Sequence, residues 1–304
     1  MKRASDHRRT AREALKGNRI KAFIALLFFS MMSGAFYSSS VQLQHQGNVP
    51  SFGENIWLSL PLGYTIPLSF SGMLLHLFLL LLFLGLTPAA RLGYTRFGLN
   101  LIDRKEAKAS QVFSGYARFW KALGTGLLIS LRLAGWSILF IAPPAALVFM
   151  LPFYIPGIIL YAIALAIGVA FTYISFGYMF AFHVLADQPD LSCSQAISES
   201  VRLMSGNRWR LLCLELSFIG WMLPPFLFAL LLELPPFFPM LLNPALFQIL
   251  SIIVLLFDLL YNCLFLTPYM DTAYCSFYRE LTALPADTKE QEMPEIHAEE
   301  DPSK

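Results

Sequence analysis

Six long apolar runs alternate with polar segments along the chain, and this pattern predicts the elements of the fold. A helix needs about 20 apolar residues to cross a hydrocarbon core about 30 Å thick, and each run is long enough. The predicted spans cover about 20–40, 65–87, 123–150, 157–186, 210–233 and 246–270. We therefore predict an all-α, polytopic membrane helix bundle with six transmembrane helices and additional interfacial helices on its cytoplasmic side.

The Lys and Arg residues fall on alternate sides of these runs. The segments 1–21, 88–122, 187–210 and 276–304 hold 21 of the 22 basic residues, whereas 41–64, 151–155 and 234–245 hold none. Loops on the cytoplasmic side of helical membrane proteins carry the basic excess. We therefore expect a multi-pass protein of the cell membrane (the inner or plasma membrane), with both termini in the cytoplasm.

Composition supports one membrane domain rather than a soluble one. Hydrophobic residues make up 56% of the chain and charged residues 14%, whereas soluble domains average about a quarter charged. The expected domain covers 1–282, and the acidic residues of 283–304 predict a disordered cytoplasmic tail. The expected partner is the lipid bilayer. The basic residues flank predicted spans as topology signals do, which excludes a nucleic-acid-binding protein.

Four polar residues inside the spans, Arg132, Glu215, Asp258 and His76, are candidates for an intramembrane site, because charge at mid-bilayer is costly. Counted from the cytoplasmic ends, the Cα depths of Arg132 and Glu215 differ by about 6 Å. A structural ion pair, a solute or proton site and an unpaired, snorkelling arginine all fit. Asp258 is placed to line a cavity or to accept a hydrogen bond from Asn262. The isolated His76 is more typical of a hydrogen-bonded residue in the bundle than of a ligand.

Two proline pairs, Pro143-Pro144 and Pro224-Pro225, lie in predicted spans. Proline removes a backbone donor and kinks or breaks a helix. Each pair either breaks its helix at mid-depth or only ends it near the outer side, and both interpretations stay open.

The sequence contains no motif for catalysis or for metal and cofactor binding. It has no nucleophile motif, phosphate-binding loop or HExxH. We assign no catalytic residue, no metal site and no cofactor.

Two amphipathic segments fall on the predicted cytoplasmic side. In 110–121, apolar residues follow helical spacing, which fits either an interfacial helix or one packed on the bundle. In 194–205, Ser192 and Gln195 form a predicted capping box, and Gly206 is the expected stop. Ile197, Val201 and Met204 form one stripe of that helix.

The stretch from Ala196 to Trp221, with Leu203-Met204-x-Gly206-Asn207-Arg208-Trp209, resembles the signature of the domain-of-unknown-function 975 family. Asp187-x-Pro189 before it, and Pro268-Tyr269 and Phe277-Tyr278 near the end, agree with that family over about 1–282. The resemblance implies a bacterial six-span integral membrane protein and brings no assigned activity. Its candidate motif at the cytoplasmic face comprises Asp187, Pro189, Ser200, Met204, Gly206, Asn207, Arg208, Trp209, Tyr269 and Tyr278.

Three functional hypotheses follow. The first is a non-enzymatic membrane protein that binds or moves a small or lipid-like solute. The second is a scaffold or accessory protein that docks a protein partner through its cytoplasmic helices, 110–121 and 194–205. The third is a membrane-embedded lipid-processing enzyme, for which no catalytic set is visible.

Overall fold

A computed structural model describes residues 3–33, 40–43, 56–59, 65–67, 70–150, 157–233 and 244–283, and these residues are predominantly helical. The helices are α1 (Ala4–Leu15), α2 (Arg19–Ser33), α3 (Phe70–Ile102), η2 (Ala109–Arg118), α4 (Phe119–Met150), α5 (Gly157–Ser175), η3 (Phe176–Tyr178), α6 (Ala181–Asp187), α7 (Cys193–Met204), α8 (Arg208–Leu216), α9 (Ile219–Glu233), α11 (Pro244–Tyr261), η4 (Asn262–Leu266) and α12 (Thr267–Ala283). The helical class that the sequence predicted is confirmed.

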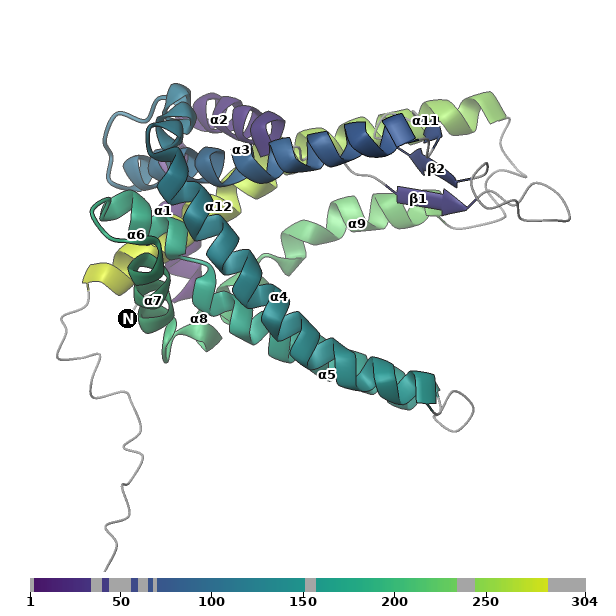
Figure 1. Cartoon of the computed structure of the whole chain (residues 1–304). Coiled ribbons are helices and arrows are strands. Elements are labelled where there is room, and N and C mark those ends of the chain that lie inside the picture. The colour runs from purple at the N-terminus through teal and green to yellow at the C-terminus, as the bar shows by residue number, and fades with distance from the viewer. Residues whose placement is uncertain are drawn as a thin grey trace, which may run out of the picture.

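Three short strands are an addition that the apolar pattern did not predict. They are β1 (Ser40–Leu43), β2 (Ile56–Ser59) and β3 (Thr65–Pro67), paired antiparallel in the order β1-β2-β3. Val41 pairs with Leu58, and Leu58 with Ile66. Figure 1 shows β1 and β2 at the end of the molecule away from α1.

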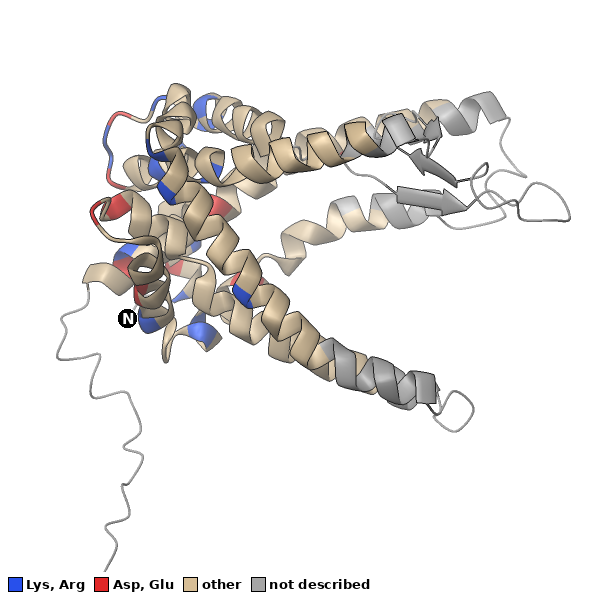
Figure 2. Cartoon of the chain, in the orientation of Figure 1, with Lys and Arg blue, Asp and Glu red and all other residues tan. Residues whose placement is uncertain are grey.

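The helices form a body at one end, from which long arms extend (Figure 1). The body contains α1, α6, α7, α8 and the end of α12. α9 contacts α11, α3 extends in the same direction in Figure 1, and α4 with α5 diverges from them. Lys, Arg, Asp and Glu gather in the body, whereas the described parts of the arms are almost free of them (Figure 2).

Side-chain burial divides the molecule in the same way. Phe180, Phe218 and Tyr278 are fully buried in the body. On the diverging arm, Leu131 is 71% exposed and Leu165 70% exposed. A protein in water does not leave so large an apolar surface open, but lipid is a suitable solvent for it. The arms therefore have the surface of membrane-spanning helices.

Four helical segments among the described residues are long and apolar enough to cross a membrane. They are Leu77–Ile102, Ala109–Phe140, Ala162–Asp187 and Ile252–Ala283. The first predicted span, 20–40, is helical only through the 15 residues of α2, and residues 34–39 lie outside the described part.

The fifth predicted span, 210–233, is two helices instead of one. α8 ends at Leu216 and α9 begins at Ile219. Ser217 donates its hydroxyl proton to the Leu214 carbonyl at 2.6 Å, a local bond that competes with the helix ladder. The Ser217 carbonyl accepts a hydrogen bond from Arg8 of α1 at 2.9 Å. The break is thus held by a second helix.

Prolines lie inside helices, which corrects two expectations. α3 continues through Pro88 to Ile102, although the predicted span ended at 87. α4 and α9 likewise run past Pro143-Pro144 and Pro224-Pro225, so neither pair ends its helix. Pro225 cannot donate to the Trp221 carbonyl, and the Tyr261 hydroxyl donates to it instead at 2.9 Å. The lost backbone bond becomes a link between α9 and α11.

Two glycines let α3 and η2 pack backbone against backbone. A Cβ on Gly93 would lie 1.9 Å from the Val112 carbonyl oxygen, and one on Gly115 1.9 Å from the Ala89 carbonyl oxygen. Both distances are far inside van der Waals contact. This close backbone contact aligns η2 with α3, and α4 begins directly after η2.

Gly93→Ala and Gly115→Ala should each force α3 and η2 apart. Overpacking of this kind costs about 1–3 kcal/mol or more of unfolding free energy. Thermal unfolding of the detergent-purified protein measures it. Gly135→Ala is the matched control, because a Cβ there meets nothing within 4 Å. Equal melting temperatures for Gly93→Ala and Gly135→Ala would contradict the close packing.

Candidate functional site: a polar cavity between α3 and α12

A cavity of about 300 Å³ lies where α2, α3, α12 and the η3–α6 region meet. Both polar and apolar side chains line it. The lining residues are Ala22, Phe29, Arg91, Tyr94, Thr95, Phe97, Gly98, Met179, His183, Thr267, Pro268, Asp271, Thr272, Tyr274 and Cys275. Such a mixed lining fits the usual composition of small-molecule sites, in which a few polar groups orient a ligand against apolar walls.

The polar groups come from three elements. The Tyr94 hydroxyl donates to Asp271 Oδ2 at 2.8 Å, which joins α3 to α12. The Arg91 guanidinium lies 5.5 Å from the centre of the Phe182 ring. His183 Nε2 is 3.7 Å from the Cys275 thiol sulfur. A cation, a carboxylate and an imidazole therefore face one cavity.

α2 contributes two residues to the apolar wall of the cavity. Ala22 is 2% exposed, and the Phe29 ring stacks on Tyr94 with their centroids 5.1 Å apart. Thr95 is also buried. The wall holds Tyr94 in the orientation in which its hydroxyl reaches Asp271.

A π-helical turn places Asp271. η4 covers Asn262–Leu266 and is followed at once by Thr267 and Pro268 of α12. Because proline clashes with the carbonyl four residues earlier, a wider turn before it relieves the clash. Such a turn also rotates the face that follows. Asp271 thereby faces α3.

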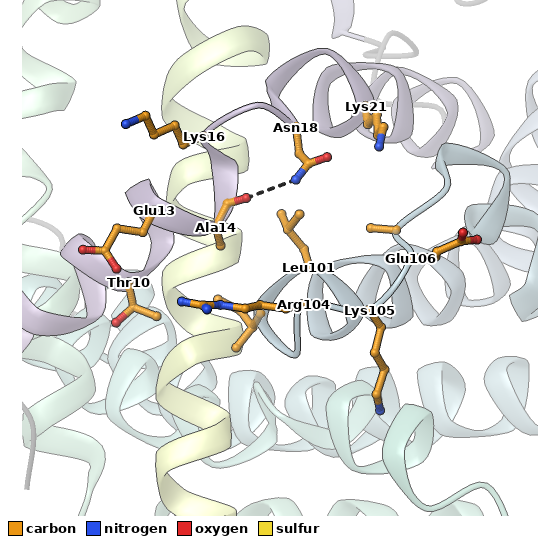
Figure 3. A pocket seen from close by; sticks show the side chains of 12 residues that line it. Thr10, Glu13, Ala14, Lys16, Asn18, Lys21, Leu101, Arg104, Lys105 and Glu106 are labelled. Carbon is orange, nitrogen blue, oxygen red and sulfur yellow. Dashed lines mark hydrogen bonds between the residues drawn. The ribbon is translucent and has the colours of Figure 1, made fainter.

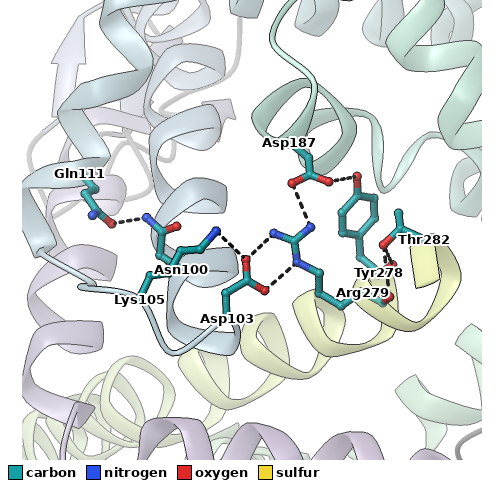
Figure 4. A network of polar contacts seen from close by, with 8 residues as sticks. All are labelled: Asn100, Asp103, Lys105, Gln111, Asp187, Tyr278, Arg279 and Thr282. Carbon is teal, nitrogen blue, oxygen red and sulfur yellow. Dashed lines mark hydrogen bonds and ion pairs between the residues drawn. The ribbon is translucent and has the colours of Figure 1, made fainter.

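An arginine at the end of α12 joins three elements of the body (Figure 4). Arg279 donates to both carboxylate oxygens of Asp103, at 2.9 and 2.6 Å, and to Asp187 Oδ1 at 2.9 Å. Tyr278 also reaches Asp187, at 3.5 Å. Bidentate arginine–carboxylate contacts are among the stronger polar contacts in proteins. They fix the end of α3 and the end of α6 against α12.

Glu280 connects α1, α8 and α12. Its carboxylate lies 2.8 Å from His7 Nε2 and 2.8 Å from Arg210 Nη2. His7 Nδ1 is 3.1 Å from the Ser276 hydroxyl, and Arg210 also donates to Asn207 at 2.8 Å. His7 is 1% exposed, so the contacts are buried. The basic first helix is therefore packed onto the body.

Several residues of the candidate motif at the cytoplasmic face make contacts within the body. Ser200 donates to the Gly177 carbonyl at 2.8 Å, and the Pro189 carbonyl accepts from Lys121 at 2.9 Å. Gly206 has a φ of +77°, as expected of a helix stop, and the Ser192–Gln195 capping box is confirmed. Met204 is fully buried.

Trp209 of that motif lies at the surface of the body, whereas its tyrosines, Tyr269 and Tyr278, are buried. Arg208 lies 4.7 Å from the centre of the Tyr173 ring, and Trp209 is 68% exposed. Tyr269 packs edge-on against Phe218 and accepts a hydrogen bond from Arg12 at 3.2 Å. That bond raises the pKa of the Arg12 guanidinium.

Three of the four intramembrane candidates, Arg132, Glu215 and Asp258, have described side chains, and no salt bridge or hydrogen bond joins any two of these three. Among the described residues, no salt bridge joins Arg132 to Glu215. Asn262 donates to Asp258 Oδ1 at 2.8 Å, as the spacing predicted. His76 belongs to α3, and its side chain lies outside the described part. Their functional role stays a prediction.

Sequence reasoning missed Arg91, Tyr94 and Asp103 because it ended the second span at 87 and placed these residues in a polar cytoplasmic segment, 88–122. The signal that Pro88 lies within a helix was the run of small residues around it, Ala89, Ala90 and Gly93, which suits helix packing. Within the described chain, no three His, Cys, Asp or Glu residues are grouped to hold a metal ion.

The chain matches, over residues 1–285, the model of a family described as "Protein of unknown function (DUF975)". The chain therefore belongs to the DUF975 family, and its described residues include four apolar helical segments of membrane-spanning length. No curated protein and no solved structure matches it.

Arg279→Gln should destabilise the protein by about 2 kcal/mol, because Asp103 and Asp187 lose their charged donor. Both carboxylates are partly buried, 20% and 30% exposed. Thermal unfolding in detergent gives the value. Arg202→Gln is the control: that arginine is 63% exposed in a pair within one helix, and its loss should cost less than about 1 kcal/mol. Equal losses of unfolding free energy in the two variants would contradict a larger contribution from Arg279.

Proposed function

We propose that the chain is a multi-pass protein of a bacterial plasma membrane that crosses the bilayer six times and keeps both termini in the cytoplasm. The charged body then lies on the cytoplasmic side, and the apolar arms cross the lipid. The distribution of charge in Figure 2 supports this orientation, because basic residues accumulate on the cytoplasmic side of membrane helices.

Exposed tryptophans support the same placement. Trp120 and Trp209 are 80% and 68% exposed and stand at the starts of α4 and α8. Tryptophan is enriched at the membrane–water interface. Both residues lie next to cations, Lys121 and Arg208, which suits the headgroup layer on the cytoplasmic side.

Cysteine labelling in whole cells tests this topology. With a membrane-impermeant maleimide, Asn48→Cys and Asn243→Cys should be labelled in intact cells, because both positions fall in outer loops. Lys105→Cys should be labelled only after the cells are permeabilised. The wild-type chain, whose four cysteines are Cys193, Cys213, Cys263 and Cys275, is the background control. Labelling of Lys105→Cys in intact cells would refute the orientation.

The function that the geometry supports best is binding, or moving, a small or lipid-like solute through the cavity between α3 and α12. The main observation in support is the cavity of about 300 Å³, which Arg91, Tyr94 and Asp271 line together with apolar side chains. Burying a charged group is costly unless it is paired, which makes Arg91 and Asp271 functional candidates. An amphiphile would place its polar group at Arg91 and Asp271 and its apolar part along Phe29 and Met179.

Two competing functions receive less support. The stripe proposed for docking a partner is occupied by the chain itself: Ile197 and Met204 are both fully buried. Cys275 and His183 resemble a nucleophile and base, but Cys275 is 3% exposed, and buried cysteines of this kind are usually inert. Solute binding without chemistry is the simpler role for the cavity.

Mass spectrometry of the purified protein tests the cavity. The wild type, isolated from its native membranes in mild detergent, should retain a molecule that Asp271→Asn and Arg91→Gln retain at least about tenfold less, since a charged hydrogen bond contributes about 1.5–3 kcal/mol. Asp190→Asn, an exposed carboxylate outside the cavity, is the control. Equal retention by all four proteins, or none by the folded wild type, would refute the proposal.

A further inference from the structure

A second pocket opens on the surface of the body, between the α1–α2 turn and the end of α3. Its volume is about 360 Å³. Leu101 and Ala107 form a buried floor. Figure 3 shows Arg104 along one side with its guanidinium toward Thr10, and Lys21 on the opposite side. Lys16 and Lys105 stand at the rim and extend outward.

The pocket has an excess of positive charge. Lys16, Lys21, Arg104 and Lys105 line it together with two acids, Glu13 and Glu106. Each acid is neutralised by a cation outside the lining. Glu13 pairs with Arg9 at 3.1 Å and Glu106 with Lys108 at 3.0 Å. The bond from Lys108 lowers the pKa of the Glu106 carboxyl.

Three of the four lining cations, Lys16, Lys21 and Arg104, form no salt bridge among the described residues. The charge of Lys21 contributes, after the bond from Lys108, to the lowered pKa of the Glu106 carboxyl. Lys105 lies 3.5 Å from Asp103, but Arg279 already binds both oxygens of that carboxylate. The lining cations are therefore left to attract an anion from outside the chain.

Arg104 occupies a backbone position that favours glycine. Its φ is +55°, in the left-handed region. The Lys105 amide donates to the Asn100 carbonyl at 2.9 Å and the Arg104 amide to Leu101 at 3.4 Å, the hydrogen bonds of a Schellman helix stop. A side chain at this position costs free energy that glycine avoids. Strain of this kind is typical of positions that a function requires.

The N-terminus of α2 adds to the positive potential. The Asn18 carbonyl accepts from the Ala22 amide at 3.0 Å, so the first turn of α2 begins at the pocket. Amides at a helix start, together with the helix dipole, favour an anion there. This contribution reinforces the side-chain charge.

An apolar stripe leads away from the pocket along α2. Ile20, Ile24, Leu27 and Met31 follow helical spacing and are exposed, Ile20 by 74%. Ile20 is next to Lys21 in sequence. A molecule with a charged head in the pocket would therefore find a surface suited to an apolar tail.

We propose that this pocket binds a phosphate-bearing anion, with Arg104 and Lys21 as its main ligands. Two sources carry that chemistry: the headgroup of an anionic phospholipid and a free phosphate. Basic pockets at the cytoplasmic ends of membrane helices are suited to anionic headgroups. The site is separate from the cavity between α3 and α12. The proposal for it does not depend on the solute proposed for that cavity.

Arg104→Gly separates binding from folding, because it removes the cation and relieves the backbone strain together. The purified protein in non-ionic detergent is titrated with dioleoylphosphatidylglycerol, dioleoylphosphatidylcholine or inorganic phosphate. Bound lipid is counted by native mass spectrometry, and the melting temperature is followed. Without added ligand, Arg104→Gly should melt at or above the wild-type temperature. Its affinity for the anionic probe should fall about tenfold, as for a lost charged contact.

Lys21→Gln is the second variant, and Arg202→Gln is the control of matched charge change outside the pocket. Both Arg104→Gly and Lys21→Gln should weaken binding, and Arg202→Gln should not. Binding of phosphatidylglycerol without inorganic phosphate supports the headgroup, and binding of both supports a free phosphate at the same residues. The proposal is wrong if phosphatidylcholine binds equally well, or if Arg104→Gly and Lys21→Gln bind the anionic probes as tightly as Arg202→Gln.

Discussion

The close backbone contact between α3 and η2 is the constraint on which the arrangement of the body depends. Because Gly93 and Gly115 leave no room for a Cβ, η2 must turn back along α3 before α4 begins. α3 is a continuous helix of 33 residues, about 50 Å long at 1.5 Å per residue. That exceeds the hydrocarbon thickness of about 30 Å. The excess length carries Arg91, Tyr94 and Asp103 into the body, where α12 meets them.

Both candidate sites follow from places where a helix departs from the regular α form. The π turn at Asn262–Leu266 rotates α12 so that Asp271 faces Tyr94. The left-handed residue at the end of α3 presents Arg104 beside the start of α2. Pro268 disfavours a regular α-helical turn at the first place, and Schellman hydrogen bonds end the helix at the second. The irregular forms persist because side chains elsewhere, such as Arg279 on Asp103, hold the segments that flank them.

Local signals in the sequence were enough for some features and not for others. The capping box at Ser192, the stop at Gly206 and the Asp258–Asn262 bond depend on residues within four positions of one another, and the structure confirms all three. Pro88 carries the local signal of a helix end, but tertiary packing of α2 and η2 on α3 overrides it. Arg279 binds Asp187 and Asp103, which lie 92 and 176 positions away in the sequence. Hydrophobic periodicity in a single sequence does not predict contacts between residues so far apart.

The location of the polar groups bears on how such a protein tolerates charge within lipid. Arg91 and Asp271 line a cavity in the region where the long helices merge into the body, and the buried contacts of Glu280 lie wholly within the body. Farther along the arms, Asp258 keeps a hydrogen-bond donor on its own helix, Asn262. Buried charge is costly without a partner. Charges are therefore concentrated in the body, where the chain itself supplies counter-groups, whereas the described parts of the arms expose mainly apolar side chains.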